Sequence, residues 1–405
     1  MTISPASPLE APALEHAAAA PLLDQVERWA SINSGSRNLS GLSMMADMLA
    51  DAFAILPGEV RLLDPAPVDA IAPDGKRVDV AHGRNLHVSV RPDAPVQLLL
   101  TGHMDTVFGA DHAFQSLRWL EPGVLNGPGV ADMKGGIAIM LAALAGLERS
   151  PLAPGIGYEV VINSDEEVGS PGSAALIARA ARNKIAALTY EPAALPDGTL
   201  AGARPGSGNF SLIVGGRSAH AGRNPQDGRN ALVAAADLAL RLARAAGPGL
   251  SINPAKIDGG GPNNVVPDHA VLRVNLRPMT PEDEDRARAL IGQIVAKVST
   301  AHDVSIHVHG GFGRPPKPMT AHAERLYELV RDCGAVLGLP IGWRATGGVC
   351  DGNNIAACGV PVVDTMGVRG GAIHSGEEYL IVESLGERAR LSALVLLRLA
   401  QRGRV

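Results

Sequence analysis

The sequence predicts an α/β protein, with a largely parallel central sheet flanked by helices and a smaller α+β domain inserted into it. Continuous apolar runs, typical of strands buried on both faces, alternate with helical patterns in the first half of the chain. From about residue 206 the strand patterns instead alternate apolar and polar residues, as half-exposed strands do. After "GRPPKP" the first pattern returns and continues to the end.

These changes of pattern predict the domain boundaries. We expect a catalytic domain in two parts, residues 1–205 and 316–405, interrupted by a lid domain at residues 206–315. The length of 405 residues also suggests two domains, because single hydrophobic cores rarely grow so large.

The first part of the catalytic domain alternates helices with apolar strands. In order, we expect helices at 20–34 and 40–56, a strand at 96–101, a helix at 132–150, a strand at 158–164, a helix at 170–183 and a strand at 186–190. Such alternation indicates a parallel sheet that is covered on both faces.

The insert combines alternating strands with two amphipathic helices. We expect strands with one exposed face in "GNFSLIVGGRSAHAG", "DHAVLRVNLRPM" and "VSIHVHGG". The helices are expected at 228–246 and 280–301. One face of the insert's sheet should therefore pack under two helices.

The composition excludes several classes of function. A net charge of −5 gives no reason to expect nucleic acid or an anionic membrane as partner. We also expect no membrane span, because no run of about 18 apolar residues appears. Three cysteines without a C-x-x-C pair argue against a disulfide framework or a thiolate zinc site. The N-terminus lacks the basic region of a secretory signal, so we expect a cytoplasmic location.

Polar residues follow the predicted strands at the points where functional sites form in open α/β sheets, the carboxyl ends. A lone histidine, a capping aspartate or a solvated acidic turn is each more often structural, but their coincidence at one sheet edge favours a site. Asp165 keeps that structural interpretation, as a solvated or capping residue. The candidates are His103 and Asp105 after 96–101, Asp132 in "GPGVADMKGG", Glu166 and Glu167 after 158–164, Glu191 after 186–190, and His374 in "GAIHSGEEY".

Imidazoles and carboxylates without thiolates suit a hydrolytic zinc site, and two metal ions need a bridging carboxylate. We expect Asp132 to bridge, with His103 and Glu191 on one metal ion and Glu167 and His374 on the other. Asp105 could accept the second imidazole N–H of His103. Glu166 would stay free as general base.

These residues carry a resemblance to the family of zinc-dependent peptidases and amidohydrolases that includes glutamate carboxypeptidase, acetylornithine deacetylase and succinyl-diaminopimelate desuccinylase. The matching motifs are "GHMDTV", "GPGVADMKGG", "SDEEVGS", "YEP", "GRSAHAG", "NNVVP" and "HSGEEY", in the family's order, and the resemblance covers the chain from about residue 25 to 400. The resemblance implies a di-zinc peptidase fold, the same ligands, and a homodimer formed through the insert. It also implies a cis peptide bond between Asp132 and Met133.

The resemblance also implies substrate-binding residues. His220 matches a histidine that enters the partner subunit's active site and holds the oxyanion. Asn264 and Arg277 match residues that hold a substrate carboxylate in the carboxypeptidase branch, and Arg204 is a weaker candidate. Cys350 occupies a position where the family more often has Ser or Thr, which puts substrate contacts of the loop 345–354 in doubt.

The sequence therefore predicts a hydrolase with two zinc ions per subunit, although cobalt or manganese could occupy such a site. The expected substrate is a small molecule whose peptide or amide C–N bond lies next to a free carboxylate, as in a C-terminal glutamate. The alternatives are an N-acyl-amino-acid deacylase of the deacetylase or desuccinylase type, a dipeptidase, and a non-catalytic metal- or ligand-binding protein. A serine hydrolase is disfavoured, because no G-x-S-x-G motif appears.

Overall fold

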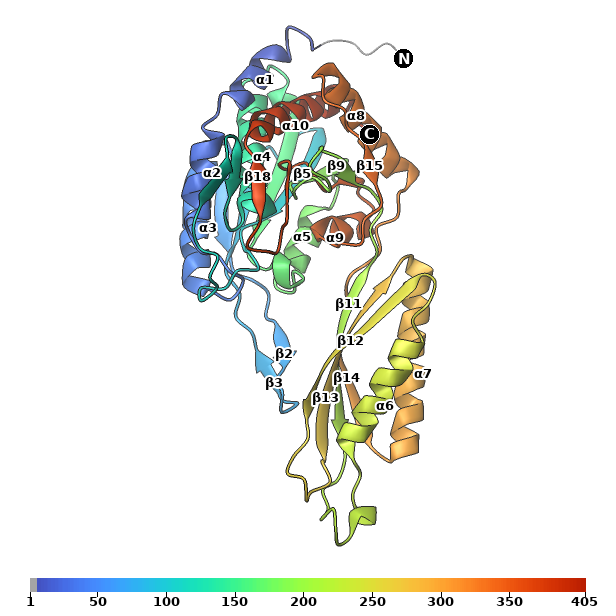
Figure 1. The fold of residues 1–405 in the computed structure, drawn as a ribbon. Coiled ribbons are helices and arrows are strands. Elements are labelled where there is room, and N and C mark those ends of the chain that lie inside the picture. The colour runs from blue at the N-terminus through green and yellow to red at the C-terminus, as the bar shows by residue number, and fades with distance from the viewer. Residues whose placement is uncertain (1–5) are drawn as a thin grey trace.

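The computed structural model describes residues 6–405 (Figure 1). Residues 1–5, the beginning of the predicted segment 1–205 and of the N-terminal stretch considered above, lie outside the described residues. The chain forms a rounded domain and an elongated arm that extends from it (Figure 1).

A six-stranded sheet forms the centre of the rounded domain. Its strands, in spatial order, are β1 (Glu59–Leu63), β4 (Asn85–Val90), β8 (Ile156–Asn163), β5 (Val96–His103), β9 (Ala186–Thr189) and β16 (Val362–Val363). The four strands from β8 to β16 are parallel, whereas β4 is antiparallel to both of its neighbours. The predicted α/β class is confirmed, and β4, which runs opposite to the other five strands, makes the sheet a mixed one.

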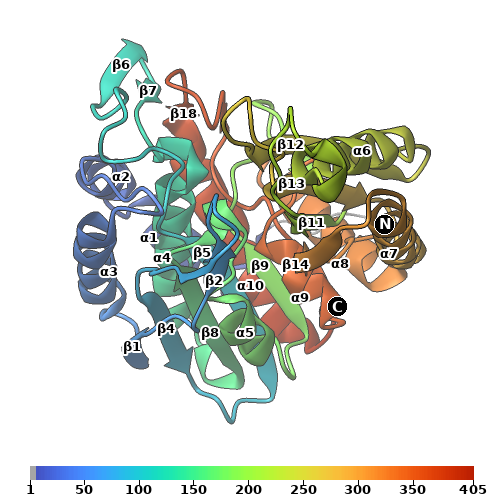
Figure 2. The ribbon, with the colours of Figure 1, turned by 90° about the horizontal axis from the view of Figure 1, so that it is seen from below.

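Helices cover both faces of this sheet (Figure 2). The larger hydrophobic cluster joins one face to α1 (Ala11–Ala18), α2 (Leu22–Ala30), α3 (Leu39–Phe53), α4 (Gly135–Glu148), α8 (Ala321–Val336) and α10 (Glu383–Arg402). A smaller cluster joins the opposite face to α5 (Ala174–Ala180) and α9 (Asp351–Ala357).

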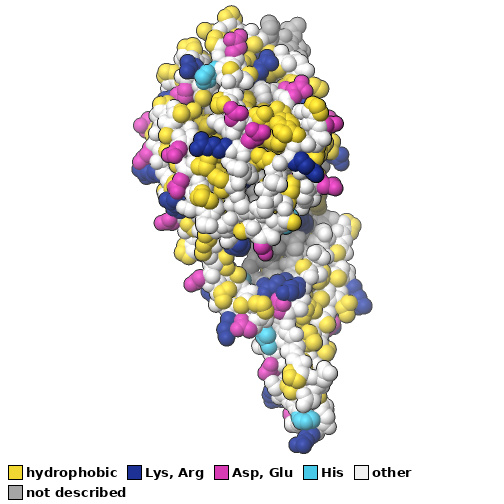
Figure 3. Space-filling view, turned by 60° about the vertical axis from the view of Figure 1, so that its left-hand side comes forward, with side chains coloured by type: hydrophobic (Ala, Val, Ile, Leu, Met, Phe, Trp, Pro, Cys, Tyr) yellow, Lys and Arg dark blue, Asp and Glu magenta, His cyan; other side chains and the backbone are white. Residues whose placement is uncertain are grey.

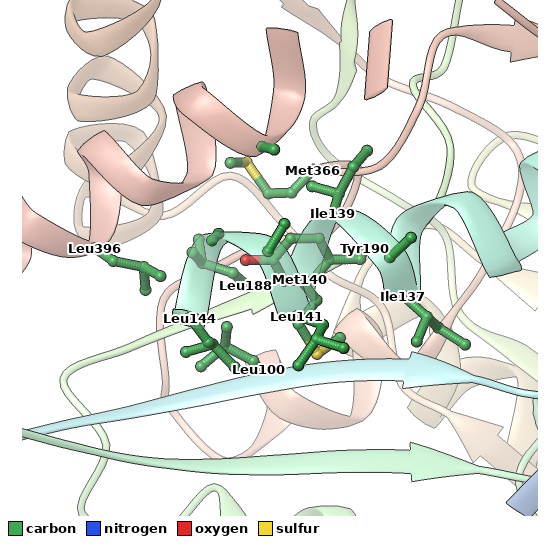
Figure 4. Packing of buried hydrophobic residues seen from close by; sticks show 14 of the residues in the cluster. Leu100, Ile137, Ile139, Met140, Leu141, Leu144, Leu188, Tyr190, Met366 and Leu396 are labelled. Atoms are coloured by element: carbon green, nitrogen blue, oxygen red, sulfur yellow. The ribbon is translucent and has the colours of Figure 1, made fainter. Parts of the chain in front are cut away.

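Helix α4 is apolar on all sides because it packs on all sides. Figure 4 shows Met140 and Leu144 of α4 between the strand residues Leu100 and Leu188 and the α10 residue Leu396. The segment 130–148 is long and apolar enough to cross a membrane, but it is almost completely buried inside the fold. A buried core helix passes the same length and composition test, so this segment is explained by the core.

A second, four-stranded sheet joins segments that are distant along the chain. Its order is β17 (Gly370–Gly371), β18 (Tyr379–Ile381), β7 (Val124–Asn126) and β6 (Arg118–Glu121). It therefore brings the loop that contains His374 next to the turn that contains Asp132. A further two-stranded sheet pairs β10 (Leu200–Ala201) with β15 (Trp343–Arg344).

The arm is an antiparallel sheet with two helices on one face. Its strands lie in the order β12 (Leu250–Gly259), β13 (His269–Pro278), β11 (Ser207–Gly215) and β14 (Ser305–Arg314). The helices are α6 (Ala231–Arg244) and α7 (Pro281–His302), and they enclose a hydrophobic core of their own with the sheet. The arm's strands thus run from residue 207 to residue 314.

The arm also touches a hairpin of the rounded domain, formed by β2 (Asp69–Ile71) and β3 (Arg77–Asp79) (Figure 1). The Arg273 side chain on β13 donates to the Ile71 carbonyl at 2.7 Å. His309 Nε2 on β14 lies 2.8 Å from Asp69 Oδ1. The arm is therefore held to the rounded domain by this hairpin as well as by the two chain segments that precede β11 and follow β14.

Candidate metal centre

Three parallel strands end at the same edge of the central sheet and place most of the candidate ligands. His103 is the last residue of β5. Glu166 and Glu167 lie in a 3₁₀ turn, Glu166–Val168, shortly after β8, and Glu191 follows β9. The carboxyl ends of neighbouring parallel strands converge, which is why residues so far apart in sequence meet here.

Asp132 comes from the turn before α4. The peptide bond between Asp132 and Met133 is cis, as the family resemblance implied. The buried Glu378 carboxylate accepts hydrogen bonds from the backbone amides of Ala131 and Asp132, both at 3.0 Å, and of Gly129 at 3.3 Å. Glu378 thus ties this turn to the "HSGEEY" segment, in which sequence reasoning assigned it no role.

His374 lies in the loop between β17 and β18 with a φ of 64°. A left-handed conformation is costly for a residue with a side chain and persists only where surrounding structure imposes it. The position is thus a strained one, of the kind that clusters at functional sites.

The two oxygens of Asp132 face different histidines. Oδ1 lies 3.0 Å from His103 Nε2, and Oδ2 lies 3.3 Å from His374 Nε2. Within the described residues, two groups of potential metal ligands occur, one formed by His103, Asp132 and Glu191 and the other by Asp132, Glu167 and His374. Asp132 is common to both groups, which is the position that a bridging carboxylate requires.

The donor set fits a pair of divalent cations. Glu191 Oε2 lies 3.7 Å from His103 Nε2, whereas its buried Oε1 has no hydrogen-bond partner among the described residues. An unpartnered buried carboxylate oxygen is costly unless an ion or a donor satisfies it. Imidazole nitrogens with carboxylate oxygens are the ligands of hydrolytic zinc sites.

The electrostatics of the cluster also favour cation binding. Burial, reinforced by nearby carboxylates, raises the pKa of Glu167 to about 8 and that of Glu191 to about 8. Hydrogen bonds to Asp132 and Glu167 raise the pKa of His374 to about 11. Burial therefore disfavours the charged form of these carboxylates. Bound cations would compensate their negative charge and stabilise that form.

Asp105 has a wider role than the one predicted. His103 Nδ1 lies 3.0 Å from the Asp105 backbone carbonyl and 3.4 Å from its carboxylate, so the carbonyl is the nearer acceptor. The carboxylate accepts instead from the backbone amides of Glu166 at 3.1 Å and Glu167 at 3.2 Å, and from the Ser36 hydroxyl at 2.7 Å. Asp105 therefore orients both the histidine and the acidic turn.

Asp165 has the structural role expected of a solvated or capping residue, but it is not solvated. Its side chain is buried, and it accepts hydrogen bonds from the Gly172 backbone amide at 2.6 Å and from the Ser173 hydroxyl. The carboxylate thus holds the turn before α5. Of the three adjacent acidic residues, only Glu166 and Glu167 face the cavity.

All the proposed metal ligands except the buried His103 line a cavity of about 450 Å³. Four of the candidate carboxylates and His374 form one wall, with the His374 side chain 54% exposed. The other walls are mostly small or apolar and include Pro192, Ala193, Val349, Ile373 and Tyr379. Such a cavity has room for a small-molecule substrate whose reacting bond lies beside the cluster.

Arg204 also lines this cavity, but its guanidinium group is already engaged. It donates to both oxygens of Asp364, at 2.7 and 3.2 Å, and to the Gly348 carbonyl at 3.1 Å. Arg204 thus has a structural role beside the cavity, and its predicted substrate-binding role stays a prediction. Neighbouring Cys350 is buried with its Sγ 3.6 Å from Asp364, and burial raises the pKa of this thiol well above its usual value. Cys350 is thus a neutral packing residue rather than a nucleophile.

Arg277 lies at the rim of the cavity. Its side chain donates to the carbonyl of Gly347 at 2.8 Å, between the cavity-lining residues Thr346 and Gly348, and to Asn275 at 3.1 Å. Its Nη2 makes no hydrogen bond within residues 6–405. Arg277 is thus available for an anion at the cavity entrance.

His220 and Asn264 lie side by side, away from the metal ligands of the same chain. Val265 pairs with His220 in an isolated β-bridge, and both His220 and Asn264 are exposed. They belong to the loops that join β11 to α6 and β12 to β13, at the end of the arm that is remote from the rounded domain (Figure 1). His220 Nδ1 accepts from the backbone amides of Gly222 and Arg223, so Nε2 projects outward.

The chain is similar in sequence to known peptidases and related hydrolases. Residues 99–398 match the family model described as "Peptidase family M20/M25/M40". Carboxypeptidase G2 from Pseudomonas sp. (strain RS-16) is 30% identical over 333 residues, which cover 80% of this chain and 79% of that protein. Succinyl-diaminopimelate desuccinylase from Psychrobacter arcticus (strain DSM 17307 / VKM B-2377 / 273-4) is 27% identical over 335 residues, covering 78% and 81%.

Solved structures share the fold. Aminopeptidase PepT from Bacillus cereus ATCC 10987 aligns with a TM-score of 0.70 at 23% identity, covering 95% of this chain and 98% of that one. Human carnosine dipeptidase 1 aligns with a TM-score of 0.70 at 15% identity, covering 96% and 100%. A Bacillus subtilis protein described as a dinuclear metal binding peptidase aligns with a TM-score of 0.64 at 12% identity, covering 93% and 97%.

Proposed function

The chain belongs to the peptidase family M20/M25/M40, and on that premise we propose that it is a di-metal hydrolase that cleaves a peptide or amide C–N bond next to a free carboxylate. The predicted family resemblance is confirmed. Membership also makes the chain an enzyme, a metallopeptidase or related hydrolase, rather than a non-catalytic binding protein.

One observation carries the proposal. The two oxygens of Asp132 face two different imidazoles, and each oxygen belongs to its own group of three potential ligands. His103 and Glu191 would hold one cation with Asp132, and Glu167 and His374 would hold the other. A structural site would use four protein ligands on one ion, whereas this arrangement leaves coordination positions open to the cavity.

Bound there, two divalent cations supply a water of lowered pKa and polarise the scissile carbonyl. Glu166, which lines the cavity, takes the proton of the attacking water and delivers it to the leaving amine. Asp105 orients His103 and holds the backbone amides of Glu166 and Glu167. We propose zinc as the native metal, because it suits this ligand set.

The cavity supports a substrate with a free carboxylate on one side of the scissile bond. Arg277 at the rim offers a guanidinium nitrogen to that carboxylate. The small apolar walls suit an apolar group on the other side. This pattern favours a reaction like the one that carboxypeptidase G2 is named for, in which an amino acid leaves from a carboxyl terminus.

We also propose that the enzyme is a homodimer through the arm. Helix α6 exposes an apolar stripe formed by Val233, Ala236 and Leu240, beside the edge strand β12. An apolar stripe beside an unpaired edge strand suits a second copy of the same surface. In such a dimer, His220 and Asn264 of one subunit would complete the cavity of the other.

The cytoplasmic location stays a prediction.

A substrate panel tests the proposed function. The purified protein is dialysed against chelator, reloaded with zinc, cobalt or manganese, and assayed on acyl-glutamates, N-acetyl and N-succinyl amino acids, and dipeptides. We expect metal-dependent turnover, greatest for apolar acyl groups on a C-terminal amino acid. Amidation of the terminal carboxylate should raise KM for the same substrate about 10- to 100-fold, because the charged hydrogen bond to the carboxylate is weakened.

The panel also decides between the alternatives. Greatest turnover on N-acetyl or N-succinyl amino acids would identify a deacylase, as the desuccinylase relatives suggest. Greatest turnover on free dipeptides would identify a dipeptidase. Activity that survives complete removal of divalent metal would overturn the di-metal proposal.

A further inference from the structure

We propose that Arg314 is the positioning residue for Glu166: it holds one oxygen of the carboxylate so that the other faces the cavity. This role rests on the proposed function, in which Glu166 is the general base. Sequence reasoning did not single out Arg314, which precedes the proline pair in "GRPPKP" at the end of the arm.

The contact is short and buried. Arg314 Nη1 donates to Glu166 Oε1 at 2.6 Å, and both side chains are more than nine-tenths buried. Arg314 Nη2 donates to the Glu166 backbone carbonyl at 2.8 Å. The guanidinium group thus grips the same residue at its side chain and at its backbone, which fixes the side-chain conformation of Glu166.

The two oxygens of Glu166 are consequently different. Oε1 is held by Arg314, whereas Oε2 makes no hydrogen bond within the described residues 6–405. Because Glu166 lines the cavity, Oε2 is the oxygen available to a water there. During the reaction, Oε2 accepts one proton from the attacking water and releases that proton to the amine nitrogen as the C–N bond breaks.

An alternative role for Arg314 is to neutralise the charge of Asp351, but the distances favour Glu166 as its partner. Arg314 Nη2 lies 3.5 Å from Asp351 Oδ1, which is farther than Nη1 lies from Glu166. Asp351 instead accepts hydrogen bonds from the Ser170 hydroxyl and from Asn163 Nδ2, the latter at 2.8 Å. Glu166 is therefore the stronger partner of Arg314.

The backbone next to Arg314 is anchored, as a positioning residue requires. Buried Asn353 of α9 donates to the carbonyls of Pro205 and Pro315, both at 2.8 Å. These prolines lie in the two chain segments that connect the arm to the rounded domain, so Asn353 holds both segments. In the same two segments, the backbone amide of Arg204 donates to the Lys317 carbonyl at 2.9 Å, and the amide of Lys317 donates to the Arg204 carbonyl at 3.0 Å. Arg314 is thus fixed to the catalytic domain at the root of the arm.

Two variants test the role with the zinc-loaded, full-length enzyme. In Arg314→Ala we expect kcat to fall roughly 10²-fold with KM nearly unchanged, because a displaced base costs about that much. Adding guanidinium chloride at tens of millimolar should restore kcat by about tenfold, since the ion can occupy the vacated site. Arg314→Lys keeps the charge and should fold, but it cannot make both contacts, so its kcat should fall about tenfold.

Arg91→Lys is the matched control. Arg91 forms a two-point ion pair with Glu148 at 2.5 and 2.9 Å, away from the cavity, so its loss should change thermal stability without changing kcat. Zinc content is measured for every protein and should stay at the wild-type value, because Arg314 contacts no proposed ligand side chain.

The outcomes are separable. Unchanged kcat in folded, metal-loaded Arg314→Lys overturns the positioning role alone. A fall in kcat that matches lost zinc, or one that guanidinium does not relieve in a folded Arg314→Ala protein, assigns Arg314 to structure instead. No turnover by the wild type across the substrate panel overturns the proposed function, and the role of Arg314 with it.

Discussion

The sheet edge that contains the metal ligands and the far end of the arm carry residues predicted for one active site. The two regions differ in the burial and in the contacts of those residues. At the sheet edge, His103, Asp132 and Glu191 are buried, with His103 Nε2 3.0 Å from Asp132 Oδ1 and 3.7 Å from Glu191 Oε2. At the end of the arm, His220 and Asn264 are exposed, and within residues 6–405 their hydrogen bonds go to backbone groups of the two end loops. Figure 3 shows the arm as a narrow extension, with charges of both signs scattered over it and over the rounded domain.

This difference separates two requirements of catalysis. The metal ligands must be held in place before any substrate arrives, because misplaced ligands lose the cations, and a buried, hydrogen-bonded sheet edge does this within one chain. The oxyanion and carboxylate contacts are needed only when substrate is present. They can therefore come from a movable arm or from a second subunit.

Removal of the metals should produce the largest effect on the sheet-edge region. Asp132→Asn weakens both ligand groups at once, so we expect loss of bound metal and a fall in kcat/KM of roughly 10⁴-fold or more. Elemental analysis and kinetics measure both. Asp47→Asn, which breaks an exposed pair with Arg84, should change neither. Normal activity in a metal-free Asp132→Asn protein would contradict the model of the site.

A mixing experiment tests whether the arm serves the other subunit. Glu166→Gln should lose about 10²–10⁴-fold in kcat, and His220→Ala about 10²–10³-fold. If His220 acts in the partner's site, a re-paired equal mixture should recover about a quarter of wild-type activity, because half of the dimers gain one intact site. No recovery, although mixed dimers form, would place His220 in its own subunit's site.

Arg277 should have a smaller effect that depends on the substrate. Arg277→Ala should raise KM about 10- to 100-fold for substrates with a free carboxylate, since charged hydrogen bonds contribute about 1.5–3 kcal/mol. Steady-state kinetics on matched acid and amide substrates measures this. Arg273→Ala is the control on the same strand, because Arg273 contacts Asp258 and the hairpin. Equal changes for acid and amide would remove Arg277 from carboxylate binding.

The smallest effect concerns the hairpin that joins the two regions. The hydrogen bond from His309, together with Arg77, lowers the pKa of Asp69 below its usual value of 3.8. The contact is therefore complete above pH 3.8 and is lost as pH falls through the lowered pKa. Hydrogen exchange of residues 69–79, corrected for intrinsic rates, should be slower at pH 5 than below pH 3, where Asp69 is protonated, and should be faster in Asp69→Asn. Loosening of the wild type already at pH 5 would contradict this assignment.

Much of the metal centre follows from the sequence because one topological rule applies to it. Each of His103, Glu167 and Glu191 follows an apolar strand, and neighbouring parallel strands must end at one edge. The strands β1 and β4 were not predicted: β1 is short and half-exposed, and β4 has only six residues. The hairpin β2–β3 was missed for the same reason.

The sequence by itself determined the fold class and the set of residues able to hold two cations, because periodicity and residue type express burial and ligand chemistry locally. Only the tertiary structure decided which cationic side chain meets which carboxylate. Arg204 lines the cavity with its guanidinium group paired to Asp364, and Arg314 rather than a residue near in sequence holds Glu166. Long side chains find partners according to the packing of segments more than a hundred residues apart, and no local pattern records that packing.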